Sequence, residues 1–113
     1  MGRKMILIIG GAYQGKTEYA KEHFDGEYEI WNQYHERVRQ QLLEQKDPLE
    51  EAKRAFKGQD KLIIISDEVG YGLVPIEAFE RSYREAVGRV NCFFAKEATQ
   101  VIRVVCGVGK RIK

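Results

Sequence analysis

The sequence predicts a single α/β domain in which a mostly parallel central sheet lies between two layers of helices. A chain of 113 residues can bury one hydrophobic core but leaves no room for a separate second domain. Continuous apolar runs of strand length alternate with amphipathic stretches, which is the pattern of strands joined by covering helices. No repeat, low-complexity tract or Gly-, Pro- and Ser-rich linker interrupts residues 1–113. We therefore expect one three-layer domain over the whole chain.

The amino-terminal part predicts a strand, a turn and a helix in close succession. Met5–Ile9 is wholly apolar and has strand length, so it is expected to be a strand buried on both faces of the sheet. A helix is expected over Thr17–Phe24, after a glycine-rich turn. Asp25 and Gly26 mark a break, and the following stretch Glu27–Trp31 predicts a short strand.

Two amphipathic helices and a strand are expected in the middle of the chain. Across Gln33–Glu44, apolar residues recur at four-residue steps between charged ones. Asp47 is a helix-capping residue and Pro48 suits the first helical position, so a second helix is expected from there to Gly58. Lys61–Ile65 then predicts the next buried strand.

The carboxyl-terminal part predicts a loop, a long helical segment and a final strand. Residues 68–75 contain two glycines and a proline, which indicates a loop. Ile76–Gln100 carries apolar residues at three- and four-residue steps and is expected to be one long helix or a pair broken at Gly88. Val101–Val105 predicts the last strand, and residues 106–113 are interpreted as a glycine-rich basic tail.

Composition argues against several classes of function. The 19 basic and 17 acidic residues give a net charge of +2, which does not indicate a nucleic-acid or anionic-membrane partner. No apolar segment approaches the ~20 residues of a membrane span, and the first apolar run is too short for a signal peptide. Cys92 and Cys106 lie in apolar contexts and predict buried, reduced thiols, and the two histidines show no metal-ligand spacing. A cytoplasmic protein is expected.

The turn after the first strand carries a phosphate-binding motif. The stretch GGAYQGKT follows the pattern G-x-x-x-x-G-K-[ST] between an expected strand and an expected helix, which is the context that this motif requires. Its glycines let backbone N–H groups curl around phosphates, and the helix N-terminus adds the positive end of a dipole. Lys16 is expected to reach the β- and γ-phosphate oxygens. The expected nucleotide-binding residues are Gly10, Gly11, Ala12, Tyr13, Gln14, Gly15, Lys16 and Thr17.

A metal site is expected where two acidic residues follow the strand Lys61–Ile65. Ligands of an open parallel sheet lie beyond the carboxyl ends of its strands, so the side chains of Asp67 and Glu68 would point towards the phosphates. With the hydroxyl of Thr17 they form the expected ligand set for Mg²⁺. The alternative, a polar strand exit in which Asp67 caps a turn, stays open.

Other polar residues carry two interpretations each. His35 would act as a general base or as a nucleophile towards phosphorus, or else be structural. Arg81 and Arg84 stand one helical turn apart and would face a phosphate together, or pair with neighbouring glutamates on a solvated helix face. The cations of the tail would approach a nucleotide base or simply keep the tail soluble; they are Lys110, Arg111 and Lys113.

Separated segments of the chain resemble one known family: GGAYQGKTEYA, SDEVGYGLVP, ERSYREAVGRVN and VIRVVCGVGKRIK. It is the bifunctional adenosylcobinamide kinase/adenosylcobinamide-phosphate guanylyltransferase family of cobalamin synthesis. The first segment looks like that family's P-loop. The others look like its carboxyl-terminal signature, with matches at Glu68-Val69-Gly70, Gly72-Leu73-Val74-Pro75, Arg81-Ser82-Tyr83-Arg84 and Gly88-Arg89-Val90-Asn91. The resemblance covers the front of the chain and nearly everything after Ile63.

The resemblance implies a P-loop NTPase-like fold and a kinase of cobalamin synthesis. Such a kinase transfers the γ-phosphoryl group of GTP or ATP, with Mg²⁺, to the hydroxyl of the aminopropanol arm of adenosylcobinamide. Lys16 would neutralise developing charge, Thr17 would hold Mg²⁺, and Glu68 or Asp67 would complete the metal shell. A corrinoid is much wider than a shallow cleft on one small domain, so subunits are expected to pack together as a homo-oligomer.

The middle of the chain, Glu27–Asp60, departs from the family pattern because full-length members are longer there. One alignment puts His35 in the place of the histidine that accepts GMP, which would keep a guanylyltransferase activity. The other puts Asn32 where an acidic residue would stand and leaves no nucleophile; the apolar pattern through Trp31 favours it. Two rival functions follow. One is a non-catalytic nucleotide-binding sensor or assembly protein, and the other is a kinase that acts on another small alcohol.

Overall fold

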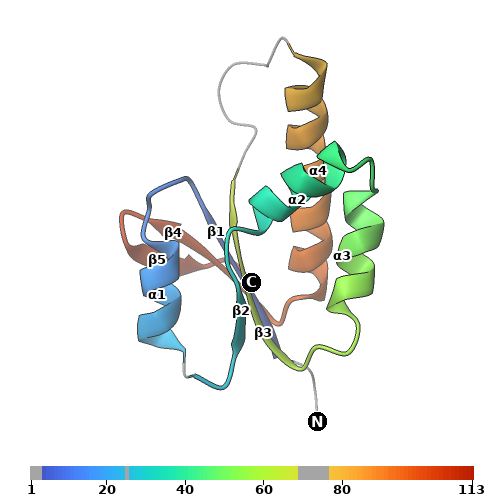
Figure 1. The fold of residues 1–113 in the computed structure, drawn as a ribbon. Helices are drawn as coiled ribbons and strands as arrows, with labels where there is room; N and C mark the ends of the chain where they lie inside the picture. Colours follow the sequence, from blue (N-terminus) through green and yellow to red (C-terminus); the bar gives the residue numbers. More distant parts are fainter. Residues whose placement is uncertain (1–3, 25, 69–76) are drawn as a thin grey trace.

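In the part of the chain that the structure describes, a five-stranded sheet lies at the centre, with one helix on one face and three on the other (Figure 1). The computed structural model describes residues 4–24, 26–68 and 77–113. Along the chain the elements are β1 (Lys4–Gly10), α1 (Lys16–His23), β2 (Glu29–Trp31), α2 (Tyr34–Leu43), α3 (Pro48–Phe56), β3 (Lys61–Asp67), α4 (Ala78–Glu97), β4 (Gln100–Val105) and β5 (Val108–Arg111). The expected three-layer α/β architecture is confirmed.

The strand order is β2-β3-β1-β4-β5, and every neighbouring pair is parallel except β4 with β5. β1 and β3 pair along their whole length, so that Gly10 stands opposite Asp67. The carboxyl ends of parallel strands lie at one edge of a sheet. The glycine turn that follows β1 therefore begins at the same level as the acidic residue that ends β3.

Two hydrophobic clusters hold the layers together, one on each face of the sheet. Because side chains alternate along a strand, Met5 and Leu7 of β1 pack with the buried residues of α2, α3 and α4. Ile6 and Ile8 face the other way and pack with Ala20 of α1. The side of the sheet covered by three helices has the larger cluster. Because both faces are covered, successive residues of β1 and β3 are all buried, which accounts for their continuous apolar runs.

Helix boundaries agree with the expected segments to within a few residues. The carboxylate of Asp47 accepts hydrogen bonds from the backbone N–H groups of Leu49 and Glu50, as expected of a capping residue. α4 runs without a break through Gly88, because buried side chains on either side of that residue, Val87 and Val90, hold the helix to the sheet. The loop expected at residues 68–75 lies outside the described residues, apart from Glu68.

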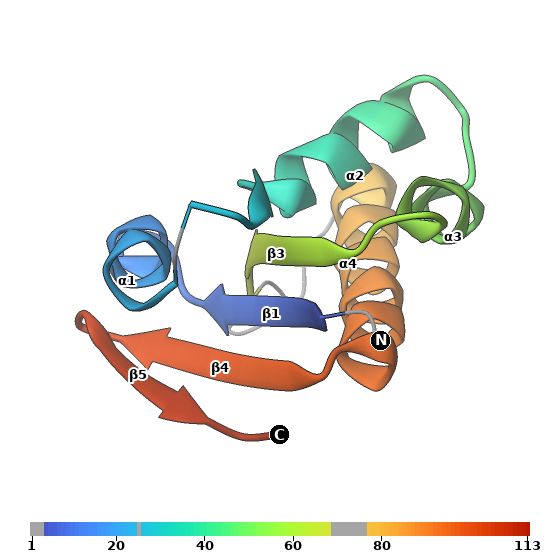
Figure 2. The same cartoon turned by 90° about the horizontal axis from the view of Figure 1, so that it is seen from below.

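The interpretation of residues 106–113 as a tail is wrong, because this segment contains β5, which pairs antiparallel with β4 at the edge of the sheet (Figure 2). A close contact with α1 explains the glycine in this strand. A Cβ at Gly109 would lie 2.3 Å from the ring of Tyr19, so glycine lets the aromatic side chain lie here without being displaced. The prediction of buried thiols is also wrong: Cys92 and Cys106 are exposed, one on α4 and one in the β4–β5 turn.

Among the described residues, no helix is both long and apolar enough to cross a lipid bilayer.

A pair of glycine substitutions tests the packing at the end of β1. A Cβ at Gly10 would lie 2.4 Å from the carbonyl oxygen of Val104, which belongs to the backbone of β4 and cannot rotate away. We expect Gly10→Ala to lower the free energy of unfolding by about 1–3 kcal/mol, the usual cost of overpacking. Unfolding in urea measures it.

Gly11→Ala is the matched control. There the nearest atom to a new Cβ is the flexible side chain of Gln14, at an ordinary contact distance of 3.7 Å. This variant should stay within about 0.5 kcal/mol of the parent, as substitutions away from packed positions usually do. Equal stabilities for the two variants would contradict the close approach of β1 and β4.

Candidate nucleotide-binding site

The turn from β1 into α1, residues 10–17, has the backbone shape of a phosphate-binding loop, and we call it the P-loop. Gly15 and Tyr13 have φ angles of 85° and 61°, in the left-handed region. Left-handed residues placed among right-handed ones turn successive N–H groups towards one concave side, where an anion binds. α1 begins at Lys16, so its N-terminus also points into this turn. Tyr13 holds its left-handed conformation without the freedom of glycine, which requires support from the surroundings.

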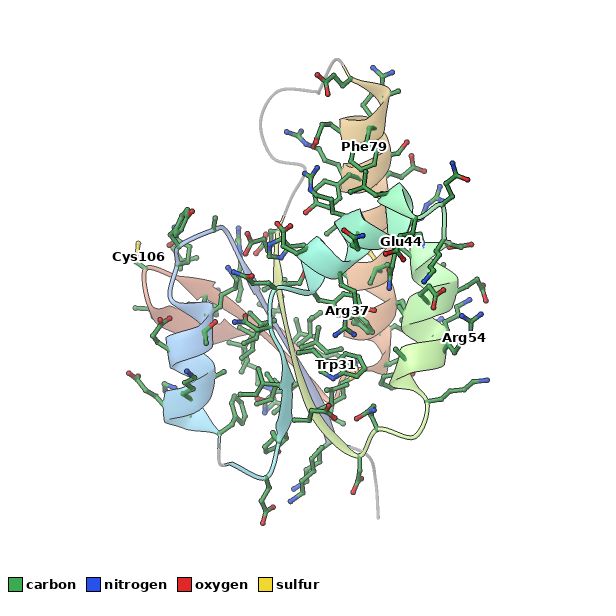
Figure 3. The ribbon with its side chains drawn as sticks, viewed as in Figure 1. Trp31, Arg37, Glu44, Arg54, Phe79 and Cys106 are labelled. Atoms are coloured by element: carbon green, nitrogen blue, oxygen red, sulfur yellow. The ribbon has the colours of Figure 1, made fainter. Side chains whose placement is uncertain are left out.

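The β4–β5 turn supplies that support. The side-chain carbonyl of Gln14 accepts a hydrogen bond from the N–H of Cys106 at 2.6 Å, and its backbone carbonyl accepts one from Gly107 at 2.8 Å. Figure 3 shows Cys106 at the tip of this hairpin, beside the turn that leads into α1. The conformation of the P-loop thus depends on a strand pair about ninety residues further along the chain.

Lys16 lies in the P-loop with its ammonium group held by two oxygens. Nζ donates to the carbonyl of Gly11 at 2.6 Å and forms an ion pair with Oδ1 of Asp67 at 2.7 Å. The residue is only 7% exposed. A charge this well buried needs such a partner, and a phosphate group would replace the carboxylate as that partner.

His35 is buried at the start of α2 and faces Asp67 with both ring nitrogens. Nδ1 accepts a hydrogen bond from the backbone N–H of Asp67 at 3.0 Å, and Nε2 lies 3.3 Å from Oδ2 of the same residue. Because Nδ1 accepts, the proton of the neutral ring is on Nε2, the nitrogen that faces the carboxylate of Asp67 and lies 3.7 Å from Oε1 of Glu36. Burial lowers the pKa of the His35 imidazole below its usual 6.5 and outweighs the opposing attraction of Asp67.

Thr17 and Asn32 meet at the side of the cavity that faces β2. The hydroxyl of Thr17 donates to the amide oxygen of Asn32 at 3.2 Å. A hydroxyl and an amide oxygen are hard ligands of the kind that Mg²⁺ accepts, and Mg²⁺ usually takes few protein ligands besides phosphates and water. These side chains therefore fit a magnesium ion bound together with a nucleotide.

Glu68 turns away from this group. Its carboxylate accepts a hydrogen bond from Nε of Arg103 on β4 at 2.8 Å, and its backbone N–H donates to the carbonyl of Gly10. No group of three or more His, Cys, Asp or Glu side chains that would hold a metal by themselves occurs within the described ranges.

A cavity of about 380 Å³ lies over the P-loop and the ends of β2 and β3. The residues that line it are Ala12, Tyr13, Gln14, Gly15, Lys16, Thr17, Glu18, Asn32, Gln33, His35, Glu36, Ile65 and Asp67. Most of the side chains expected in the nucleotide site thus share one cavity of the size that binds small molecules. Glu68 is not among the lining residues.

Several cations outside this cavity have structural partners. Glu80, next to Arg81, pairs with Arg39 of α2 at 2.9 Å, and Glu85 pairs with Arg89. Lys113 donates to the backbone carbonyls of Ala95 and Lys96 at the end of α4, which is a favourable place for a cation. Neither Arg81 nor Arg84 is among the residues that line the cavity over the P-loop.

Comparison with known proteins places the chain in a family. Residues 28–112 match the family described as cobinamide kinase / cobinamide phosphate guanyltransferase. The chain belongs to this family. Members of it have a P-loop NTPase-like fold, in agreement with the sheet order and the shape of the P-loop.

Curated relatives match a smaller part. The bifunctional adenosylcobalamin biosynthesis proteins CobU of Escherichia coli and Salmonella typhimurium are each 42% identical to the chain over 53 residues. That stretch is 47% of this chain and only 29% of either relative. The match to the family begins at Tyr28, so the P-loop lies before it.

The buried neutral His35 predicts a loss of stability in acid. The unfolded chain takes up a proton at this ring near pH 6.5, while the folded protein resists doing so until a lower pH. The contribution of His35 is therefore complete above about pH 6.5 and is lost as the pH falls below it. We expect the free energy of unfolding, measured in urea between pH 7.5 and pH 5, to fall less steeply in His35→Gln than in the parent. Parallel curves would contradict a neutral, buried imidazole.

Proposed function

We propose that the protein is a nucleotide-dependent kinase that phosphorylates the hydroxyl of adenosylcobinamide, with GTP or ATP as donor. The observation that carries this proposal is the meeting of Lys16 and Asp67 in the cavity over the P-loop. It brings the phosphate-binding ammonium within 2.7 Å of a carboxylate, at the edge of the sheet where an acceptor would approach. Membership of the cobinamide kinase / cobinamide phosphate guanyltransferase family supports adenosylcobinamide as the acceptor.

The chain supplies positioning and charge to the reaction. Backbone N–H groups of the P-loop and the N-terminus of α1 would bind the phosphates, and Lys16 would neutralise the charge that develops between the β- and γ-phosphates. Reactions of this type need alignment and electrostatic stabilisation more than covalent chemistry by the protein. A domain of this size provides both.

Thr17 and Asn32 are the side chains that would hold Mg²⁺ beside the phosphates. A bound Mg²⁺ supplies further neutralisation of phosphate charge. The sequence-based ligand set also contained Asp67 and Glu68, but the contacts of these residues with Lys16, His35 and Arg103 favour Thr17 and Asn32. The meeting of Asn32 with Thr17 also supports the alignment in which Asn32 stands in the place of an acidic residue.

The environment of His35 does not favour a guanylyltransferase activity. A nucleophilic histidine needs one ring nitrogen free to attack phosphorus. Here both nitrogens contact Asp67 and the side chain is only 8% exposed. We infer that His35 supports the cavity rather than accepting GMP.

In this proposal the binding site for the corrinoid acceptor includes residues from more than one subunit. A cavity of about 380 Å³ holds phosphates but is small for a corrinoid besides them. We therefore infer that copies of the chain pack together to complete the acceptor site. Separately, we infer from the role of the family in cobalamin synthesis that the protein works in the cytoplasm. A monomer at micromolar concentration in light scattering, with corrinoid present, would count against the shared site.

A second candidate function is nucleotide binding without phosphoryl transfer, as in a sensor or assembly subunit. Asn32 is the observation that favours it, because an amide is a weaker magnesium ligand than the carboxylate usual at such a position.

Transfer of label from γ-labelled GTP or ATP to adenosylcobinamide tests the proposal. We expect labelled corrinoid from the parent and at least about 100-fold less from Lys16→Ala, since loss of one preorganised charge at a developing anion costs about that much. Lys21→Ala, which removes an exposed lysine from the last turn of α1, is the matched control and should keep full activity.

Each outcome separates the candidates. Bound nucleotide with no labelled corrinoid would favour the sensor. Label on an unrelated small alcohol in place of the corrinoid would keep the kinase and change its acceptor.

A further inference from the structure

Asp67 lies where the groups of the candidate site meet. Its Oδ1 contacts Nζ of Lys16 at 2.7 Å, its Oδ2 contacts Nε2 of His35 at 3.3 Å, and its backbone N–H donates to Nδ1 of the same ring at 3.0 Å. The side chain is 20% exposed, so one part of it still opens onto the cavity. Neither phosphate binding nor Mg²⁺ binding by Thr17 and Asn32 explains this arrangement.

The two contacts with His35 fix the carboxylate in one orientation. Nδ1 accepts from the backbone N–H of Asp67 and Nε2 lies 3.3 Å from its Oδ2, so one rigid ring contacts both the backbone and the side chain of this residue. Burial favours the neutral ring, which keeps one nitrogen as an acceptor and the other as a donor. Oδ2 is therefore committed to His35, whereas Oδ1 faces the ammonium of Lys16 and the space where phosphates would lie.

Nucleotide binding would release Oδ1. In the protein without nucleotide, Asp67 neutralises Lys16. A bound triphosphate brings several negative oxygens to the same ammonium and takes over that function. Oδ1 would then be a hydrogen-bond acceptor that opens onto the cavity beside Lys16, while Oδ2 would keep its contact with His35.

Other carboxylates that line the cavity are less suited to a role at the reacting atoms. Glu18 and Glu36 are exposed at its rim, and the side chain of Glu36 is 59% exposed. Glu36 lies 3.7 Å from Nε2 of His35, but an exposed side chain loses more rotamer entropy when it is held in one position, which makes it a poor positioning device. Asp67 is the least exposed carboxylate among these lining residues, and it is held by contacts from both sides.

We propose that Asp67 is a catalytic residue, the base that receives the proton of the acceptor hydroxyl, and that His35 is the positioning residue that orients it. The inference rests on the proposed kinase function. In the step, the hydroxyl O–H bond breaks and its proton passes to Oδ1 of Asp67, while the oxygen forms a bond to the γ-phosphorus. The bond from the γ-phosphorus to the bridging oxygen breaks, and its electron pair leaves with the nucleoside diphosphate. Asp67 returns the proton to solvent after product release.

Asp67→Asn tests the catalytic part. The amide keeps the size of the side chain but accepts no proton, so we expect kcat for labelled corrinoid to fall about 100-fold or more. The Kd of the nucleotide should stay equal or become tighter, because the carboxylate that competes for Lys16 is gone. Glu50→Gln, which removes an exposed carboxylate paired with Lys53, is the matched control and should leave both constants unchanged.

Two substitutions of His35 test the positioning part. Glutamine offers one amide donor and one carbonyl acceptor, so His35→Gln should retain kcat within about threefold, whereas His35→Leu removes both contacts. We expect kcat of His35→Leu to fall tenfold to about 100-fold, in line with the cost of a misplaced reacting group. KM and nucleotide Kd should change little in either variant. Thermal unfolding of each variant establishes that it is folded.

The outcomes separate the inference from the function on which it rests. Loss of kcat with retained nucleotide binding in Asp67→Asn, with recovery in His35→Gln relative to His35→Leu, supports both roles. Full kcat in Asp67→Asn, with an active parent, overturns the inference and leaves the kinase standing. Equal kcat in His35→Gln and His35→Leu overturns the role of His35. A parent that labels no corrinoid overturns the kinase function and this inference with it.

Discussion

The parallel ladder between β1 and β3 sets the geometry on which the candidate site depends. It aligns Gly10 with Asp67, so the chain leaves the sheet from two neighbouring strands at one level. After β1 the chain turns into the P-loop, which places Lys16 over the edge of the sheet. At the end of β3 it presents the carboxylate of Asp67 at the same edge. A shift of register by one residue would turn Asp67 to the opposite face of the sheet, where it would meet neither Lys16 nor His35. The apolar residues of both strands, buried on both faces, hold this register.

The buried ammonium of Lys16 has a partner of opposite charge before any ligand arrives. The ammonium of Lys16 forms an ion pair with the carboxylate of Asp67, and the same carboxylate contacts Nε2 of the His35 ring. Such a chain of contacts keeps a cation buried without leaving it unpaired, which would be costly. In the proposed function, a phosphate would therefore exchange one partner of Lys16 for another rather than fill an empty site.

Much of the architecture is readable in the sequence because it rests on local signals. The continuous apolar run of β1, the glycine motif after it and the Asp47-Pro48 start of α3 each define an element without reference to the rest of the chain. β5 lacks such a signal: Val108–Arg111 is short and contains a glycine and two cations, and only its pairing with β4 and the ring of Tyr19 over Gly109 make it a strand. The exposure of Cys106 follows from the same unforeseen hairpin.

Part of the candidate site could likewise be predicted from local sequence, and part could not. Lys16 and Thr17 follow from the motif, whereas the contacts of Asp67 with His35, of Glu68 with Arg103 and of Gln14 with Cys106 join residues that are far apart in sequence. The sequence shows His35 only as a histidine near the start of a predicted helix. Nothing in its local sequence indicates that both ring nitrogens face one aspartate. Spacing along the chain cannot show this; the packing of α2 against β3 decides it.

The dependence of the P-loop on the β4–β5 turn has a consequence for the order of assembly. The P-loop precedes the N–H groups of Cys106 and Gly107 that hold Gln14 by about ninety residues, so it is synthesised before them. β4, which lies beside β1 in the sheet, also follows the P-loop along the chain. A nascent chain that does not yet include the β4–β5 turn therefore lacks the support that holds Tyr13 in its left-handed conformation. The P-loop can take its final shape only once this hairpin has been made and has docked.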